Sequence, residues 1–139
     1  MDPSVGAIVM IGLPSGTKEF RSDAAGLMFK LALDFDLAPG IGLGTNFGFL
    51  NEEDDLGERF TAALVSASLG FDLAAGAGAF AEFSFESAGS SEDGPILILD
   101  GGFTYLFSDN AQYDIALGKA VRGEGVPDFF LTTGLSLRF

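Results

Sequence analysis

Charged side chains recur at even-numbered positions within segments that are otherwise apolar. They are Lys30, Asp34, Glu82, Glu86, Asp100, Asp114 and Arg138. Paired carboxylates can act as general acid and base in hydrolysis. A lone buried ion is very costly, so enclosed charges must neutralise one another. The sequence therefore predicts a polar network of Lys30, Asp34, Glu82, Asp100, Asp114 and Arg138. A path for protons or small solutes along three of these carboxylates, Glu82, Asp100 and Asp114, is the alternative.

The residue types missing from the chain exclude most catalytic arrangements. It contains no His and no Cys, which removes Ser–His and Cys–His catalysis, thiolate metal sites and disulfides. The segment Gly40–Gly44 has the alternating glycines of a phosphate loop, but no helix is expected to follow it. We therefore predict no enzyme activity, no cofactor and no metal site.

Acidic residues dominate the charge balance, which is −13 with 20 Asp and Glu against 7 Lys and Arg. No basic surface is present for nucleic acid. The acids gather in the clusters Glu52–Glu58 and Glu92–Asp93. The first interpretation is solvated loops, and the alternative is divalent-cation bridging. The calcium-loop spacing Asp-x-Asp-x-Asp-Gly is absent, so no metal is assigned.

Eight segments alternate between apolar odd positions and small or polar even positions, and no apolar run is long enough for a membrane helix. The strands they predict are Val5–Leu13, Ala25–Phe35, Ile41–Phe49, Phe60–Phe71, Ala77–Glu86, Ile96–Phe107, Ala111–Val121 and Phe129–Phe139. Side chains in a strand point alternately to the two faces of the sheet. The odd face carries one charge, Lys119, against seven on the even face.

This contrast indicates which face meets lipid. A soluble barrel would be apolar inside and polar outside, whereas here the uncharged odd face must look outward. The fold class predicted is all-β, an eight-stranded antiparallel up-and-down transmembrane β-barrel. Residues 1–139 form its single domain. Eight strands leave an interior just wide enough for side chains, so we expect a filled polar lumen.

Three phenylalanines end strands at a regular interval. Phe35, Phe71 and Phe107 are 36 residues apart, and each precedes a short turn. Aromatic girdles mark the membrane edges of barrels, and short turns mark the periplasmic side. The sequence therefore predicts membrane-edge aromatics at one end and both termini on the periplasmic side. The start Met1–Ser4 lacks a basic region, so we expect a mature chain from which an export signal has been removed.

The end of the chain, Asp128–Phe139, resembles the closing strand of Gram-negative outer-membrane proteins. There, a terminal Phe and alternating apolar residues, here Leu135, Leu137 and Phe139, are read by the barrel-assembly machinery. The segments Gly102–Asp114, Pro127–Phe130 and Gly134–Phe139, with Ile11–Thr17, resemble the transporter family of the MetA pathway of phenol degradation. Members of that family are longer, with more strands.

Together these patterns predict a monomer in the bacterial outer membrane, with the lipid bilayer or detergent as its surroundings. The leading function is structural: a folded membrane barrel with a packed polar lumen, a fragment or engineered miniature of a transporter-like protein. The alternative is a channel or transporter for small solutes, including hydrophobic aromatics.

Overall fold

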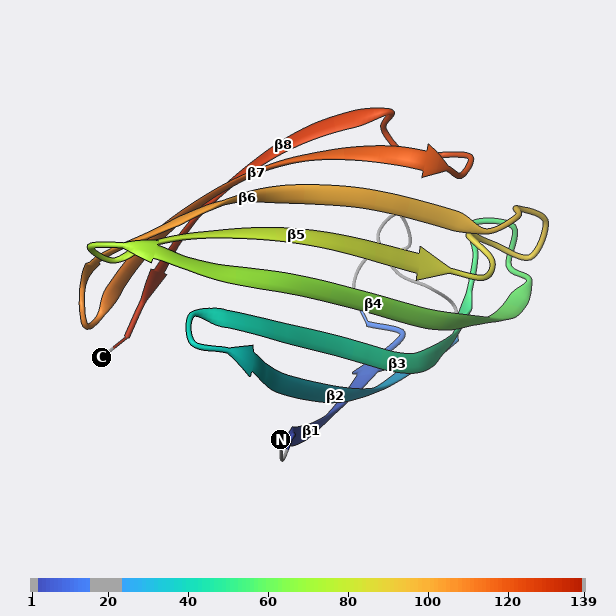
Figure 1. Ribbon diagram of the computed structural model, residues 1–139. Coiled ribbons are helices and arrows are strands. Elements are labelled where there is room, and N and C mark those ends of the chain that lie inside the picture. The colour runs from blue at the N-terminus through green and yellow to red at the C-terminus, as the bar shows by residue number, and fades with distance from the viewer. Residues whose placement is uncertain (1–2, 16–23, 139) are drawn as a thin grey trace.

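The computed structural model describes residues 3–15 and 24–138, and these form one antiparallel sheet (Figure 1). Its strands are β1 Ser4–Gly12, β2 Gly26–Ala38, β3 Ile41–Glu53, β4 Arg59–Ala74, β5 Ala77–Glu86, β6 Ile96–Ser108, β7 Ala111–Arg122 and β8 Phe129–Leu137. The described residues contain no helix that is long and apolar enough to cross a membrane. Most of the predicted loop Pro14–Ala24, and the terminal Phe139, lie outside the described residues.

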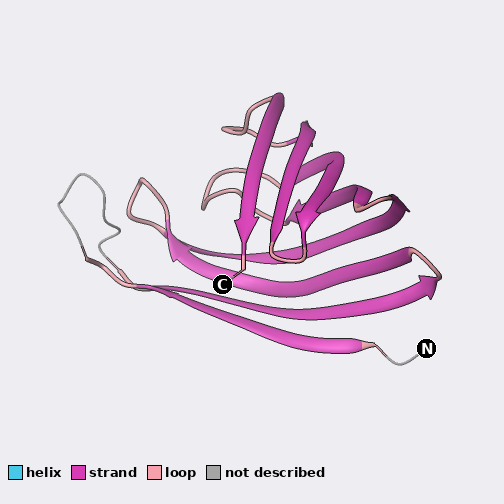
Figure 2. Ribbon diagram, turned by 90° about the vertical axis from the view of Figure 1, so that its left-hand side faces the viewer, coloured by secondary structure: helices cyan, strands magenta, loops and turns pink. Residues whose placement is uncertain are grey.

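Each strand pairs with its neighbour in sequence, so the strand order is β1-β2-β3-β4-β5-β6-β7-β8. The predicted all-β, up-and-down arrangement of eight strands is confirmed. The sheet is strongly curled but open, because β1 and β8 each pair on one side only (Figure 2). Closure into a barrel therefore stays a prediction.

Short turns and longer loops lie at opposite ends of the sheet, on the left and right of Figure 1. The turns after β2, β4 and β6 leave only two residues between strands: Pro39-Gly40, Ala75-Gly76 and Asp109-Asn110. Gly40 has φ +74°, which suits the second central position of a type II turn after Pro39. Ala75 and Gly76, at φ +51° and +81°, have the two positive angles of a type I′ turn. A type I′ turn matches the right-handed twist of adjacent strands, and two-residue connections keep neighbouring strands in register.

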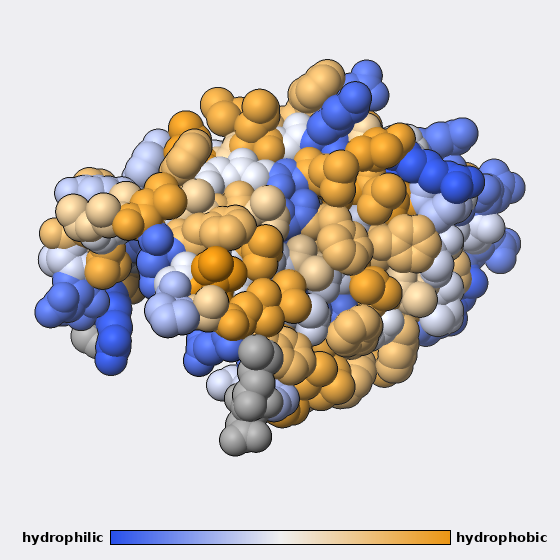
Figure 3. All heavy atoms as spheres, viewed as in Figure 1, coloured by the Kyte–Doolittle hydropathy of each residue, from blue (hydrophilic) through white to orange (hydrophobic). Residues whose placement is uncertain are grey.

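The two faces of the sheet differ in exposure. Of the 27 exposed large hydrophobic side chains among the described residues, 23 are at odd positions; the exceptions are Ile8, Met10, Leu56 and Leu106. The buried hydrophobic side chains, Phe60, Ala62 and Leu64, are all at even positions of β4. We call the odd side the outward face and the even side the concave face. In Figure 3 apolar side chains gather over the middle of the strands, and hydrophilic ones lie toward the ends.

Two strand glycines allow unusually close approach of neighbouring backbone. A Cβ at Gly48 of β3 would overlap the carbonyl oxygen of Phe29, and a Cβ at Gly102 of β6 would overlap that of Ile115. Glycine within a strand commonly marks a tight bend. The curl of the sheet therefore depends on residues without side chains at these two positions.

Candidate functional site

The six residues of the predicted polar network all lie on the concave face. Lys30 and Asp34 are on β2, Glu82 on β5, Asp100 on β6 and Asp114 on β7, and Arg138 follows β8. Their positions are even, as are those of the buried side chains of β4. The sheet thus gathers these charges from five places in the sequence along one surface.

The carboxylates Glu82 and Asp100 are directly opposite each other on adjacent strands. Like charges in such a cross-strand pair repel. Ser68 of β4 donates a hydrogen bond to Glu82, and Lys30 lies near enough to attract both Glu82 and Glu86. The repulsion between these carboxylates is therefore partly offset by the Lys30 charge on β2 and the Ser68 hydroxyl on β4.

A cavity of about 260 Å³ lies between these groups. Polar and apolar side chains share its wall, namely Lys30, Asn46, Ser66, Glu82, Ser84 and Glu86 with Leu64, Ile96 and Ile98. Asn46 donates a hydrogen bond to Ser66 at 3.1 Å. Among the described residues no direct ion pair joins the six predicted network members. Their mutual neutralisation remains a prediction.

Two of the four carboxylates in the predicted network lie against glycines of the next strand. Asp34 Oδ1 would be 3.0 Å from a Cβ at Gly44, and Asp114 Oδ1 would be 2.6 Å from one at Gly134. The missing side chains make room for the carboxylates across the strand boundary. Glycines on the concave face thus position charge as well as permitting bending.

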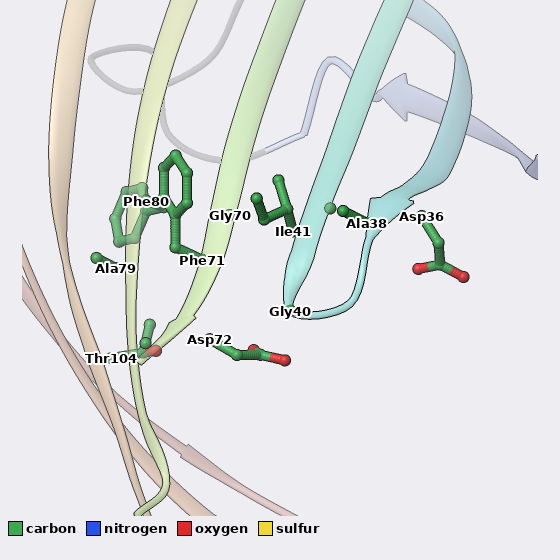
Figure 4. A pocket seen from close by; sticks show the side chains of 12 residues that line it. Asp36, Ala38, Gly40, Ile41, Gly70, Phe71, Asp72, Ala79, Phe80 and Thr104 are labelled. Carbon is green, nitrogen blue, oxygen red and sulfur yellow. The ribbon is translucent and has the colours of Figure 1, made fainter. Parts of the chain in front are cut away.

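The turn end of the concave face is hollowed by about 370 Å³ (Figure 4). Asp36 and Asp72 lie at its turn-end margin, and the ring of Phe80 lies further along the strands. A Cβ at Gly42 or Gly70 in its wall would meet no atom nearer than 3.9 Å, which is an ordinary van der Waals contact. The hollow is thus bounded by acidic groups at the turn end and by an aromatic ring deeper in.

The loop end of the sheet has a larger hollow, of about 490 Å³, formed by three loops. Its acidic lining residues are Glu52, Glu53, Asp54, Asp55, Glu92, Asp93 and Glu124. Leu56, Phe60, Ile96 and Val126 form the apolar part of its wall. No group of three or more carboxylates within residues 3–15 and 24–138 is arranged to hold a metal ion.

One residue of this acidic group connects two loops. Asp54 Oδ1 accepts hydrogen bonds from the backbone N–H groups of Leu56 and Glu58, both at 3.0 Å. Its Oδ2 accepts from the backbone N–H of Ser91 at 3.0 Å and from the Ser91 hydroxyl. These hydrogen bonds lower the pKa of Asp54 to about 2, and the two from Ser91 have the largest effect. No pattern in the sequence indicates this contact, because Asp54 and Ser91 are 37 residues apart.

We expect Ser91→Ala to raise the pKa of Asp54 toward its usual 3.8, because the largest stabilising hydrogen bond to the carboxylate is removed. The folded-state pKa lies below the unfolded value. The Asp54 contact therefore adds stability above about pH 4, and this is lost as the pH falls through about 2. A pH titration of the Asp54 carboxyl carbon by NMR measures the shift. Ser90→Ala is the control, and an unchanged midpoint in Ser91→Ala would contradict the assignment.

Aromatic side chains mark the turn end of the outward face. Phe107 packs edge-on against Tyr105, with ring centroids 5.2 Å apart, and lies 6.5 Å from the Tyr113 ring. Tyr105 and Tyr113 are directly opposite on β6 and β7. They are the chain's two tyrosines. The predicted set of membrane-edge aromatics did not include them, although both are odd-numbered and flank the turn after Phe107. Phe35 and Phe71 lie in the corresponding parts of β2 and β4.

The charges at odd strand positions lie near the opposite end, where Glu53 of β3 is directly opposite Arg59 of β4. Lys119 is in the last third of β7, and its Nζ is 5.4 Å from the ring centroid of Phe129. A cation over an aromatic face is favourable. The long side chain can also carry its charge beyond the apolar part of the strand. The charges of the outward face therefore lie at the end of the strands, where a charge costs least.

Comparison with known proteins gives a family assignment. The family model described as "Putative MetA-pathway of phenol degradation" matches residues 1–139, and so spans the whole sheet and its loops. Comparisons with curated proteins and with solved structures gave no match. The resemblance expected from the strand-end motifs is confirmed, and the chain belongs to this family of the MetA pathway of phenol degradation.

Proposed function

We propose that this protein is a monomeric transmembrane β-barrel of the bacterial outer membrane, with a structural role and no catalytic activity. The observation that carries the proposal is the outward face, where 23 large hydrophobic side chains are exposed among the described residues. Soluble monomers rarely expose apolar patches larger than a few hundred Å². Such an apolar face is compatible with the hydrocarbon core of a lipid bilayer.

The ends of the sheet suit the same surroundings. Phe107, Tyr105 and Tyr113 supply aromatic rings at the turn end, as a membrane–water interface favours. Acidic loops occupy the other end, where they would meet water. The terminal pattern of Leu135, Leu137 and Phe139 would present the last strand to the barrel-assembly machinery during insertion. No nucleic-acid partner is proposed.

The test is whether folding depends on an apolar environment. We expect β-type circular dichroism and a gel mobility that changes on heating when the chain is refolded in detergent or phospholipid vesicles. In plain buffer we expect aggregation, because the outward face would be left in water. A folded, monodisperse monomer in plain buffer would overturn the proposal.

Passage of small solutes is the second candidate, and the hollows along the concave face favour it. Volumes of about 370, 260 and 490 Å³ lie at the turn end, the middle and the loop end of this face. The family description connects the chain with phenol degradation, so a small aromatic compound is the natural first solute. Reproducible unitary conductance in a planar bilayer, reduced by added phenol, would favour this role over the structural one.

A further inference from the structure

Within residues 3–15 and 24–138, the outer edges of β1 and β8 have no strand partner. All nine residues of β1 are exposed, and β8 pairs with β7 alone. Edge strands present rows of free N–H and C=O groups, and an open edge is not tolerated in the lipid core. We infer that β8 closes on β1 of the same chain in one register, with Phe130 opposite Gly12 and Thr133 opposite Val9. This inference rests on the proposed membrane location.

The direction of closure follows from the observed pairing. One continuous row of paired residues crosses every strand: Ser4, Asp34, Gly44, Ser68, Glu82, Asp100, Gly118 and Phe130. The row starts at the first residue of β1, at the turn end, and reaches β8 at its second residue, at the loop end. From β1 to β8 the row therefore shifts by nearly a full strand length, from the turn end to the loop end of the sheet. Such a stagger is what a sheet needs in order to close with tilted strands.

Few closing registers are compatible with this row. Because an even number of strands alternates in direction, β1 and β8 are antiparallel. Paired residues must share a face, so Phe130 has to face an even-numbered residue of β1. Met10 or Gly12 opposite Phe130 keeps eight residues of each strand paired, whereas Pro14 leaves six. Proline also lacks a backbone donor.

Strand tilt separates the two remaining registers. Pairing Phe130 with Gly12 displaces the row by eight residues from Ser4, and eight strands with this displacement tilt by about 36°. Membrane barrels tilt by roughly 35–45°. Pairing with Met10 displaces the row by six residues and gives a shallower tilt than this range. The geometry favours Gly12.

Side-chain volume agrees with this choice. On the β7 side, the Phe130 ring occupies the space where a Cβ of Gly118 would be. A second glycine opposite, Gly12, leaves the same room on the β1 side, whereas Met10 would fill it. A sixteen-stranded barrel from two copies would have the same tilt, but its wide lumen would leave Phe60 and Leu64 facing water. Closure within one chain keeps them packed.

Cysteine pairs test the register, because the chain contains no Cys. Val9→Cys with Thr133→Cys matches the proposed register. Val9→Cys with Leu131→Cys and Val9→Cys with Leu135→Cys match the registers displaced by two residues in each direction. All of these positions lie on the outward face. Directly opposite residues have Cα atoms roughly 4.5–5.5 Å apart, within disulfide range, whereas a two-residue offset exceeds about 7 Å.

After refolding in vesicles and mild oxidation, we expect an intramolecular disulfide in the Val9–Thr133 variant and its loss in the two offset variants. Non-reducing gels and peptide mapping measure this. Faster bonding in an offset pair, disulfides between molecules, or no bonding in any pair would overturn the inference. Refolding of the reduced variants into vesicles is scored separately. If the reduced variants do not refold into vesicles, both the membrane proposal and the proposed closure are wrong. If they insert but form a disulfide in an offset pair, only the proposed closure is wrong.

Discussion

Replacing Phe47 by arginine is expected to lower the free energy of unfolding in lipid by about 2–4 kcal/mol, the cost of a charge near the middle of the lipid-facing side. Phe47 is the central residue of β3, and its side chain is 47% exposed on the outward face. Its partners on the neighbouring strands, Leu31 and Val65, are apolar. No nearby residue in this row could pair with the guanidinium, and both membrane edges are half a strand away. Urea unfolding in phospholipid vesicles, followed by circular dichroism, measures the change.

The matched control is Asn46→Arg, one residue away on the opposite face. Asn46 lies in the wall of the central cavity with Glu82 and Glu86, where a guanidinium would meet carboxylates instead of lipid. We expect a much smaller loss of stability. An equal loss in both variants would show that the assignment of outward and concave faces is wrong.

The second large effect is expected from Gly48→Ala, which should lower the free energy of unfolding by about 1–3 kcal/mol, as overpacking typically does. The added methyl group would overlap the Phe29 carbonyl oxygen and come within 2.9 Å of the Lys30 Cα. Backbone atoms cannot turn aside as a side chain can, so the two strands must separate. Gly102→Ala should act similarly against Ile115 and Ala116. The same urea titration applies.

Gly70→Ala is the control for this prediction. It is also a strand glycine on the concave face, but its nearest neighbour would be the Gly42 carbonyl oxygen at 4.0 Å. Substituting alanine without strain can stabilise a protein by roughly 0.4–1 kcal/mol through the unfolded chain. We expect Gly70→Ala to be neutral or slightly stabilising. If it were as harmful as Gly48→Ala, close backbone approach would not be the reason for glycine at position 48.

Alternation with a period of two was sufficient to predict all eight strands and the sorting of their side chains. β5 has the predicted bounds, Ala77–Glu86. The largest single difference is at β3, which continues four residues further, to Glu53, whereas β2 and β4 continue three residues further, to Ala38 and Ala74. Glu52 and Glu53 were expected in a loop because they are acidic. They extend β3 because their backbones pair with Phe60 and Arg59, a contribution that side-chain polarity does not reveal.

The candidate site was less predictable, because periodicity assigns a face but not a neighbour. The sequence predicted that Asp34 and Asp114 share a face, but not that each lies over a glycine of the next strand. That depends on register, which is set jointly by turn type and by bulges such as the one between Asp36 and Ala38. The Asp54–Ser91 contact likewise depends on how two loops fold over the same end.

The strand order has a consequence for how such a protein can change size. Every pairing joins strands that are consecutive in sequence, and the phenylalanines at 35, 71 and 107 recur at one interval of 36 residues. A hairpin is therefore a removable unit. Duplicating or deleting one alters the circumference and leaves the remaining pairs unchanged, since no strand has to be threaded between others. Lineages built on this plan can widen or narrow in steps of two strands, each step a single tandem genetic event.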